Sequence, residues 1–279
     1  MSKLLDKNSQ KNIVITGASS GIGKATAILM AREGHQVIAT SRHIEKLNPL
    51  IEETNSMGCP IFPEELNINK NDEVDQCFAR LFERFGSVDV LVNNAGYGLK
   101  GSINSITSEQ LQEQFNTNLF AAVSTMKAVL PSMIDKENGC IINITSILGR
   151  IATPYMGAYV SSKFALEGIS ESMRVELAPY GVRVCVVEPG LFKTNFGDNV
   201  VNATDGLDND FEQIQNKNDR AWPYKAGNPE RVARTISHLV SKKNPKFRST
   251  VGWDAYWASL AARFLPQKLF LSVVQKVMH

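Results

Sequence analysis

Cysteine, histidine and long apolar runs are all scarce in this chain of 279 residues. Its four histidines and four cysteines do not form the close pairs that a zinc site requires, so we expect no metal site and no disulfide framework. No stretch reaches the roughly 20 apolar residues of a membrane-spanning helix, and the N-terminal MSKLLDKNSQK lacks the apolar core of a signal peptide. We therefore expect a cytoplasmic protein in a reducing compartment, with Cys140 and Cys185 as small buried apolar side chains.

An excess of one charge is also missing. The net charge is +2, and the 21% of charged residues are of both signs and interspersed, which is not the single-sign field that nucleic-acid binding needs. The 43% hydrophobic content is ample for a large core. Since no linker, repeat or low-complexity block interrupts the pattern, we expect one dinucleotide-binding and catalytic domain over residues 1–279.

Short β-branched runs at 12–16, 36–40, 88–92, 140–145 and 182–187 alternate with segments of helical period at 21–33, 72–85, 108–134 and 155–178. Strands that are apolar almost throughout and alternate with helices indicate a parallel sheet covered on both faces. The predicted fold class is a doubly wound, Rossmann-type α/β domain. Residues 195–227 are polar and weakly periodic, which is typical of a functional lid or a disordered loop. Helical pattern resumes at NPERVARTI, with Asn228 as the expected N-cap and Pro229 as the first helical residue.

The stretch ITGASSGIG places Gly17, Gly21 and Gly23 between the first strand and the first helix. Glycines in that position let the backbone approach a pyrophosphate and present helix N-terminal N–H groups to it. The spacing differs from G-x-G-x-x-G, and the alternative interpretation is a tight connection with close helix packing. Its place after the first strand of a doubly wound sheet favours cofactor binding.

The second expected strand ends in VIATSRH, with Ser41 where an acid would bind the ribose of NAD and Arg42 directly after it. Arginine pairs with a 2'-phosphate, so we expect NADP(H) in preference to NAD(H). The alternative is that Arg42 is a solvated loop charge.

Tyr159 and Lys163 are one helical turn apart, and Ser146 ends the preceding strand. A phenol has a free pKa of about 10, and a neighbouring ammonium favours its ionised form, so the pair predicts an acid–base site. A Tyr and a Lys at this spacing are also common on exposed helix faces. Because ligands of open α/β sheets bind at the carboxyl ends of strands, the glycine turn and Ser146 are expected at one crevice.

In these motifs the sequence resembles the short-chain dehydrogenases/reductases, in their single-domain branch, over residues from about 11 to 194. TGASSGIG resembles the family's cofactor turn, NNAG at 93–96 its motif after the fourth strand, and PGLFKT at 189–194 the segment that holds the nicotinamide amide. The residues that match its catalytic tetrad are Asn118, Ser146, Tyr159 and Lys163.

The resemblance implies that Tyr159 transfers a proton, that Ser146 orients the substrate oxygen, and that Lys163 lowers the tyrosine pKa and binds the nicotinamide ribose. It implies that Asn118 holds a water on the proton path. It also implies the following cofactor contacts: Gly17, Ser19, Ser20, Gly21, Ile22, Gly23, Ser41, Arg42, Asn67, Ile68, Asn94, Ala95, Gly96, Tyr159, Lys163, Pro189, Gly190, Phe192 and Thr194.

Two residues depart from the family pattern without threatening activity. Asn67 stands where the family often has an aspartate near the adenine, and Thr145 replaces a frequent serine. The segment at about 191–227 corresponds to the family's variable substrate loop, so the substrate is not determined here. Four aromatic residues in it either line an apolar mouth or anchor the loop: Phe192, Phe196, Trp222 and Tyr224.

The tail at about 255–279 is amphipathic, with one apolar stripe from Pro266 onwards. We expect it to pack on the parent domain or a sister subunit, in preference to a membrane surface or a lipid-like substrate. Within the family this tail and the EPG segment are similar to the retinol and hydroxysteroid dehydrogenase branch, which favours a bulky apolar substrate. The stripe consists of Leu269, Phe270, Val273, Val274 and Val277.

The sequence therefore predicts an NADP(H)-dependent oxidoreductase of secondary alcohols or ketones that forms a homodimer or homotetramer. Its partner is a small alcohol or carbonyl compound, with no nucleic acid and no metal. A cofactor-sensing or scaffolding protein without turnover is the alternative, and it would have little need for the whole tetrad. An isomerase or epimerase that uses nicotinamide transiently is a third interpretation, less favoured because those relatives have longer chains and another glycine spacing.

Overall fold

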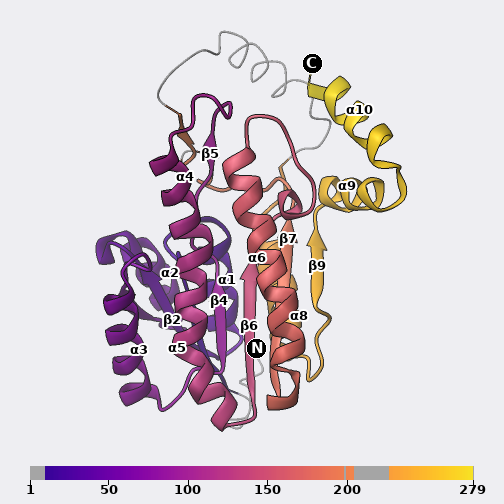
Figure 1. Ribbon diagram of the computed structural model, residues 1–279. Helices are drawn as coiled ribbons and strands as arrows, with labels where there is room; N and C mark the ends of the chain where they lie inside the picture. Colours follow the sequence, from indigo (N-terminus) through magenta and orange to yellow (C-terminus); the bar gives the residue numbers. More distant parts are fainter. Residues whose placement is uncertain (1–9, 198, 204–225, 279) are drawn as a thin grey trace.

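The computed structural model describes residues 10–197, 199–203 and 226–278. Its main sheet has seven parallel strands in the order β3-β2-β1-β4-β6-β7-β9 (Figure 1). The predicted doubly wound α/β fold of a single domain is therefore confirmed. The strands are β1 (Asn12–Ile15), β2 (Gln36–Ser41), β3 (Phe62–Glu65), β4 (Val90–Asn93), β6 (Gly139–Ile144), β7 (Val182–Pro189) and β9 (Arg248–Val251).

Helices cover both faces of this sheet (Figure 1). Side chains of α1, α2 and α8 pack on one face, and side chains of α3 and α5 pack on the other, with α6 beside them. The helices are α1 (Gly21–Arg32), α2 (Asn48–Ser56), α3 (Asn71–Phe85), α4 (Ser108–Phe115), α5 (Ala121–Asp135), α6 (Gly157–Glu176), α8 (Glu230–Ser241), α9 (Trp253–Phe264) and α10 (Gln267–Met278).

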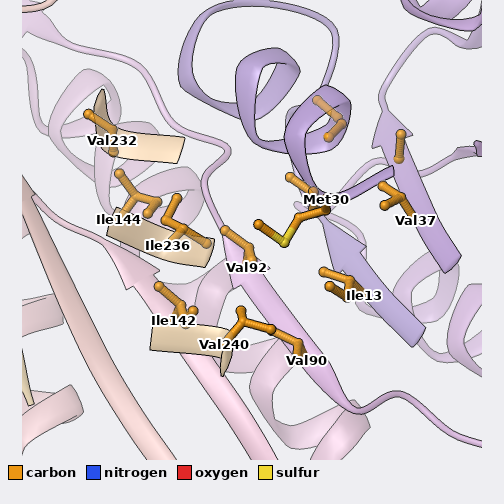
Figure 2. Close-up of a cluster of buried hydrophobic side chains, with 14 of the residues drawn as sticks. Ile13, Met30, Val37, Val90, Val92, Ile142, Ile144, Val232, Ile236 and Val240 are labelled. Atoms are coloured by element: carbon orange, nitrogen blue, oxygen red, sulfur yellow. The ribbon is translucent and has the colours of Figure 1, made fainter. Parts of the chain in front are cut away.

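Strand residues alternate between two apolar layers because successive side chains point to opposite faces. Ile13 lies in the layer under α1 and α8, together with Met30 and Ile236 (Figure 2). Val14 lies in the layer under α3 and α5. Both layers are almost fully buried, and they hold the strand ends in a fixed arrangement. Cys140 and Cys185 are buried in this core, as expected.

Two strands of the main sheet lie outside the predicted set. β3 reads FPEE and β9 reads RSTV, and they form the two edges of the sheet. An edge strand has a neighbour on one side only and carries polar residues, so it lacks the apolar run that marked the central strands. A short second sheet pairs β5 (Leu99–Lys100) with β8 (Val201–Asn202).

The helix expected over 108–134 is interrupted. Residues Asn116–Phe120 form a π-helical turn between α4 and α5. Single π turns inside helices are frequent at functional sites, and periodicity cannot reveal them because the apolar pattern continues through the turn. The expected start of α8 is also wrong by one residue, since Pro229 is the N-cap and Asn228 accepts a hydrogen bond from the Glu230 N–H at 2.9 Å.

The tail forms two helices, α9 directly after β9 and then α10 (Figure 1). Asp254 fixes the first turn of α9, because its carboxylate accepts a hydrogen bond from the Leu191 N–H at 2.6 Å. Among the described residues, no helix is both long enough and apolar enough to cross a lipid bilayer.

Candidate active site

A cavity of about 1490 Å³ lies at the carboxyl ends of the strands. Its walls come from the turns after β1, β2, β4, β6 and β7, from α6, and from the tail helices α9 and α10. Most of the predicted site residues meet there: Gly17, Ser19, Ser20, Gly21, Ile22, Ser41, Arg42, Ile68, Asn94, Ala95, Gly96, Ser146, Tyr159, Lys163, Pro189, Gly190, Phe192 and Thr194.

The glycine turn requires glycine for two reasons. Gly17 and Gly21 have φ of +64° and +55°, a region that side chains with a Cβ rarely adopt. A Cβ on Gly17 would also lie 2.9 Å from the Ala95 Cα, and one on Gly23 would collide with the Gly17 carbonyl oxygen. The N-cap residue Ser20 makes no side-chain hydrogen bond to the first turn of α1, so the N-cap side chain does not occupy the N–H groups of that turn.

Asn94 holds the glycine turn in place. Its amide donates hydrogen bonds to the carbonyls of Thr16 at 2.9 Å and Gly17 at 3.0 Å. The Thr16 hydroxyl in turn accepts from the backbone N–H groups of Asn94 at 3.0 Å and Ala95 at 3.1 Å. Thr16 was not among the predicted site residues, although a hydroxyl at the end of the first strand is the signal that could have found it.

The end of β2 supplies a cationic corner of the cavity. Arg42 lines it together with His43 and Lys46, two residues that the sequence interpretation passed over. Ser41 is buried there and accepts a hydrogen bond from the His43 N–H at 3.4 Å. Asn67 lies beside the wall, and its side chain accepts a hydrogen bond from the Asn69 N–H at 3.2 Å while Ile68 faces the cavity.

Tyr159 and Lys163 lie on one face of α6 and are 6% and 5% exposed. The Tyr159 hydroxyl hydrogen-bonds the side chain of Ser146, whose Oγ also accepts from the Leu148 N–H at 3.1 Å. The Lys163 ammonium donates to the carbonyl of Ile144 at 2.9 Å and lies 5.8 Å from the Tyr159 ring centroid. Two neighbouring structural elements, the end of β6 and α6, thus bring these three side chains together.

The electrostatics of this pair differ from the sequence expectation. Burial raises the pKa of Tyr159 to about 12, although the hydrogen bond with Ser146 acts in the opposite direction. Burial lowers the pKa of Lys163 to about 8, and the nearby Glu167 partly opposes that shift. The sequence led us to expect a tyrosine pKa below its usual value, and the net shift is in the opposite direction because desolvation is the largest cause. Tyr159 therefore keeps its proton at neutral pH.

Asn118 lies in the π-helical turn and is 1% exposed. Its oxygen accepts from the Tyr97 N–H at 3.1 Å, and its amide donates to the Tyr97 carbonyl at 3.0 Å and the Ser162 hydroxyl at 3.1 Å. These contacts fix the chain after β4 against α6. The expected contact of Asn118 with a water stays a prediction. A Cβ on Gly96 would lie 2.9 Å from this oxygen, so the backbone passes close to the site.

Apolar and aromatic side chains also line the cavity. The ring of Phe196 lies 5.5 Å from that of Tyr159, and Phe192 is 9% exposed and belongs to the core cluster. Trp222 and Tyr224 lie outside the described residues. The tail helices contribute Trp257, Ala258, Ala261, Phe270, Val273 and Val274 to the wall.

Comparison with known proteins connects this geometry to a family. The model of the short chain dehydrogenase family matches residues 11–205. A 3-ketodihydrosphingosine reductase of Bacteroides thetaiotaomicron is 38% identical over 252 residues, covering 86% of this chain and 87% of the relative. Human retinol dehydrogenase 8 is 32% identical over 252 residues, covering 85% of this chain and 80% of the relative.

Solved structures show the same similarity. A short-chain dehydrogenase from Streptomyces avermitilis matches with a TM-score of 0.81 at 30% identity, covering 96% of this chain and 97% of the other. ElxO with NADP bound matches with a TM-score of 0.75 at 28% identity, covering 87% of this chain and 97% of the other.

Proposed function

This chain belongs to the short-chain dehydrogenase family, and on that premise we propose that it is an NADP(H)-dependent oxidoreductase of bulky, apolar secondary alcohols or ketones. The observation that carries the proposal is the buried Tyr159, bonded to Ser146 and one turn from Lys163, at the wall of a cavity that also contains the glycine turn. The family and its NADP-bound neighbours support NADP-linked oxidoreduction of small molecules. The substrate class and the preference over NAD are our inference.

The residues present fit a nicotinamide dinucleotide phosphate. The α1 N-terminus, with no side-chain cap, and the close backbone at Gly17 and Gly21 would bind the pyrophosphate. Arg42 would pair with the 2'-phosphate, since a guanidinium binds phosphate through two parallel hydrogen bonds. When bound, the nicotinamide supplies or accepts the hydride.

The protein's own residues would handle the proton. Tyr159 holds a proton on its hydroxyl oxygen throughout the physiological range, because its pKa is raised to about 12. In reduction it would donate that proton to the substrate oxygen as negative charge develops there, while Ser146 orients the same oxygen by a hydrogen bond. Lys163, fixed on the Ile144 carbonyl, would bind the nicotinamide ribose and stabilise the tyrosinate left behind.

An apolar substrate is supported by the walls beyond Tyr159. Phe196 from the loop after β7, Trp257 from α9 and Phe270 from α10 supply aromatic surface without charge. The names of the relatives, a 3-ketodihydrosphingosine reductase and a retinol dehydrogenase, describe enzymes of long apolar compounds. As in most of the family, we expect a homodimer or homotetramer.

A substrate panel tests this proposal. Purified protein is incubated with NADPH and a series of steroid, retinoid, quinone and long-chain aliphatic carbonyl compounds, and cofactor oxidation is measured. We expect turnover of at least one apolar ketone, loss of turnover in Tyr159→Phe, and tighter binding of NADPH than of NADH. Cofactor binding without turnover on the whole panel would instead support a cofactor-sensing protein.

A further inference from the structure

The tail helices carry an exposed aromatic surface. We use this name for Trp253, Tyr256, Trp257, Phe264, Leu269 and Leu271, which are between 48% and 70% exposed. The rings of Trp253, Tyr256 and Trp257 follow one another at centroid distances of 6.3 and 5.4 Å. Single exposed apolar residues are ordinary, but a cluster of this size on two consecutive helices marks an interaction site.

The C-terminal part of the sequence is rich in basic residues. From residue 227 to the C-terminus the sequence has nine lysines and arginines and two acids, although the whole chain has a net charge of only +2. Of the two acids, Asp254 is buried against Leu191, and Glu230 lies 3.5 Å from Arg234 in an ion pair. Lys242, Lys243 and Lys246 lie before β9, and Arg248 is paired with Glu167 and Glu188, so these four do not contribute to the surface. The cations that favour an anionic partner there are Arg231, beside Trp253 and Tyr256, Arg263, beside Phe264, and Lys268 of α10.

A second, smaller cavity of about 630 Å³ lies between α8 and α9. Its wall combines the cations Arg231 and Arg234 with Trp253 and Tyr256 of the aromatic surface. Guanidinium groups bind phosphate through directed hydrogen bonds, and Trp and Tyr prefer the boundary between lipid headgroups and acyl chains. Both preferences are met together at the surface of an anionic membrane.

The tail helices also form part of the active-site cavity. Trp257 of α9 and Phe270 and Val274 of α10 line that cavity, while Leu269 and Leu271 of the same helix are each 51% exposed. Trp257 thus belongs both to the wall of the active-site cavity and to the exposed aromatic surface. α9 and α10 lie together at the end of β9 (Figure 1).

We propose that α9 and α10 dock this protein on an anionic lipid surface. Trp253 and Phe264 enter the headgroup region, and the nearby arginines, with Lys268, bind phosphate groups. Apolar substrate passes between the lipid and the large cavity through the layer formed by these two helices. The docking does not depend on catalysis, whereas the route of the substrate rests on the proposed function.

Co-sedimentation with sucrose-loaded vesicles tests the docking. The full chain is mixed with vesicles of phosphatidylcholine and with vesicles in which roughly a third of the lipid is phosphatidylglycerol, at several salt concentrations. The test variant is Trp253→Ser/Phe264→Ser, since these residues are 62% and 70% exposed and neither lines the active-site cavity. The matched control is Val175→Ser/Tyr180→Ser, whose side chains are 74% and 49% exposed near the end of α6.

We expect the wild type and the control to bind the anionic vesicles, and the test variant to bind roughly ten-fold more weakly or worse. A charge variant, Arg231→Gln/Arg263→Gln/Lys268→Gln, should lose about five-fold in affinity for the anionic vesicles per cation removed. Added salt should also weaken the binding of the wild type to these vesicles. The docking proposal is contradicted if the wild type does not bind anionic vesicles. It is also contradicted if the test variant binds them as tightly as the wild type does. Light scattering that shows Trp253→Ser/Phe264→Ser converting an oligomer to monomers, without vesicle binding by the wild type, assigns the surface to a second copy instead and also overturns it.

The rate of ketone reduction tests separately the proposed route of the substrate from the lipid to the active-site cavity. With a ketone dissolved in buffer, Trp253→Ser/Phe264→Ser should match the wild type, and with a long-chain ketone carried in anionic vesicles it should be several-fold slower. Equal rates with vesicle-borne ketone would contradict the route. If no carbonyl compound is reduced in either form, the proposed function fails while the vesicle-binding result still stands.

Discussion

The ammonium of Lys163 donates a hydrogen bond to the main-chain carbonyl of Ile144 at 2.9 Å. This contact joins α6 to the last residue of β6, so the helix that carries Tyr159 is fixed on the strand that leads to Ser146. A single neutral acceptor compensates little of the cost of burying a charge, and burial lowers the lysine pKa to about 8. The site therefore contains a cation that is held at the expense of stability.

Replacing Lys163 by Met should stabilise the protein and abolish turnover. The lysine pKa is 10.5 in the unfolded chain and about 8 in the folded chain. Below pH 8 the lysine is charged in both states, so the buried charge lowers the free energy of unfolding of the wild type by its full amount. The cost is relieved as the pH rises from 8 to 10.5, where the unfolded chain binds the extra proton. We expect Lys163→Met to gain at most about 3 kcal/mol at pH 7 and less at pH 9.5, measured by urea unfolding. A variant less stable than the wild type at pH 7 would contradict this.

Tyr159→Phe should remove catalysis with little effect on cofactor binding. General acid catalysis contributes about 100-fold to 10,000-fold, so kcat should fall by that order. The ring remains packed near Phe196, and the hydrogen bond with Ser146 is the main loss. NADPH titration by fluorescence and steady-state rates measure both effects, with the exposed Tyr180→Phe as control. Retained turnover in Tyr159→Phe would exclude this proton donor.

The pH profile of ketone reduction should have an alkaline limb near pH 8. Tyr159 stays protonated far above that pH, whereas Lys163 loses its charge there and no longer stabilises the developing tyrosinate. Because Glu167 raises the lysine pKa, Glu167→Gln should move the limb of kcat/KM to lower pH. A profile that is flat to pH 10 would argue against a role for the ammonium.

Arg42→Ala should weaken NADPH binding by roughly ten-fold or more and leave NADH binding nearly unchanged, because only NADPH carries the 2'-phosphate. Fluorescence titration with both cofactors measures the two affinities. Lys24→Ala is the control, since Lys24 is paired with Glu53 at 2.8 Å. Equal losses for both cofactors would show that Arg42 binds another part of the nucleotide.

Arg248→Met should be strongly destabilising. The Arg248 guanidinium lies 2.8 Å from the buried Glu188 and 2.8 Å from Glu167, so it joins β9, β7 and α6 behind the site. Removing one partner of a buried pair costs about 3–5 kcal/mol. We expect the lower end of that range, because Glu188 keeps a hydrogen bond from the Thr250 hydroxyl at 2.6 Å and the ion pair with Arg150 at 3.8 Å. Urea unfolding measures this loss. The control is Arg234→Met, because Arg234 and its partner Glu230 are both 63% exposed. Glu188→Gln introduced together with Arg248→Met should recover part of the lost free energy of unfolding.

Local patterns in the sequence were sufficient for the central strands, the glycine turn and the Tyr159–Lys163 pair, because each depends on residues close together in the chain. Gly17 and Gly21 are glycines because their own φ values are positive, and Tyr159 and Lys163 share a face because helix geometry places them so. The predicted central strands and the crevice at their ends were confirmed for the same reason.

The tertiary structure alone decided what depends on distant neighbours. β3 and β9 became strands through pairing at the sheet edges, and the helix at Asn116–Phe120 opened where Asn118 bonds Tyr97 and Ser162. Burial reversed the expected direction of the Tyr159 pKa, since desolvation depends on every group packed around a side chain. The exposure of Trp253 and Phe264 is also decided by the tertiary structure. The sequence shows that a residue is apolar, but it does not show whether other parts of the fold cover that residue.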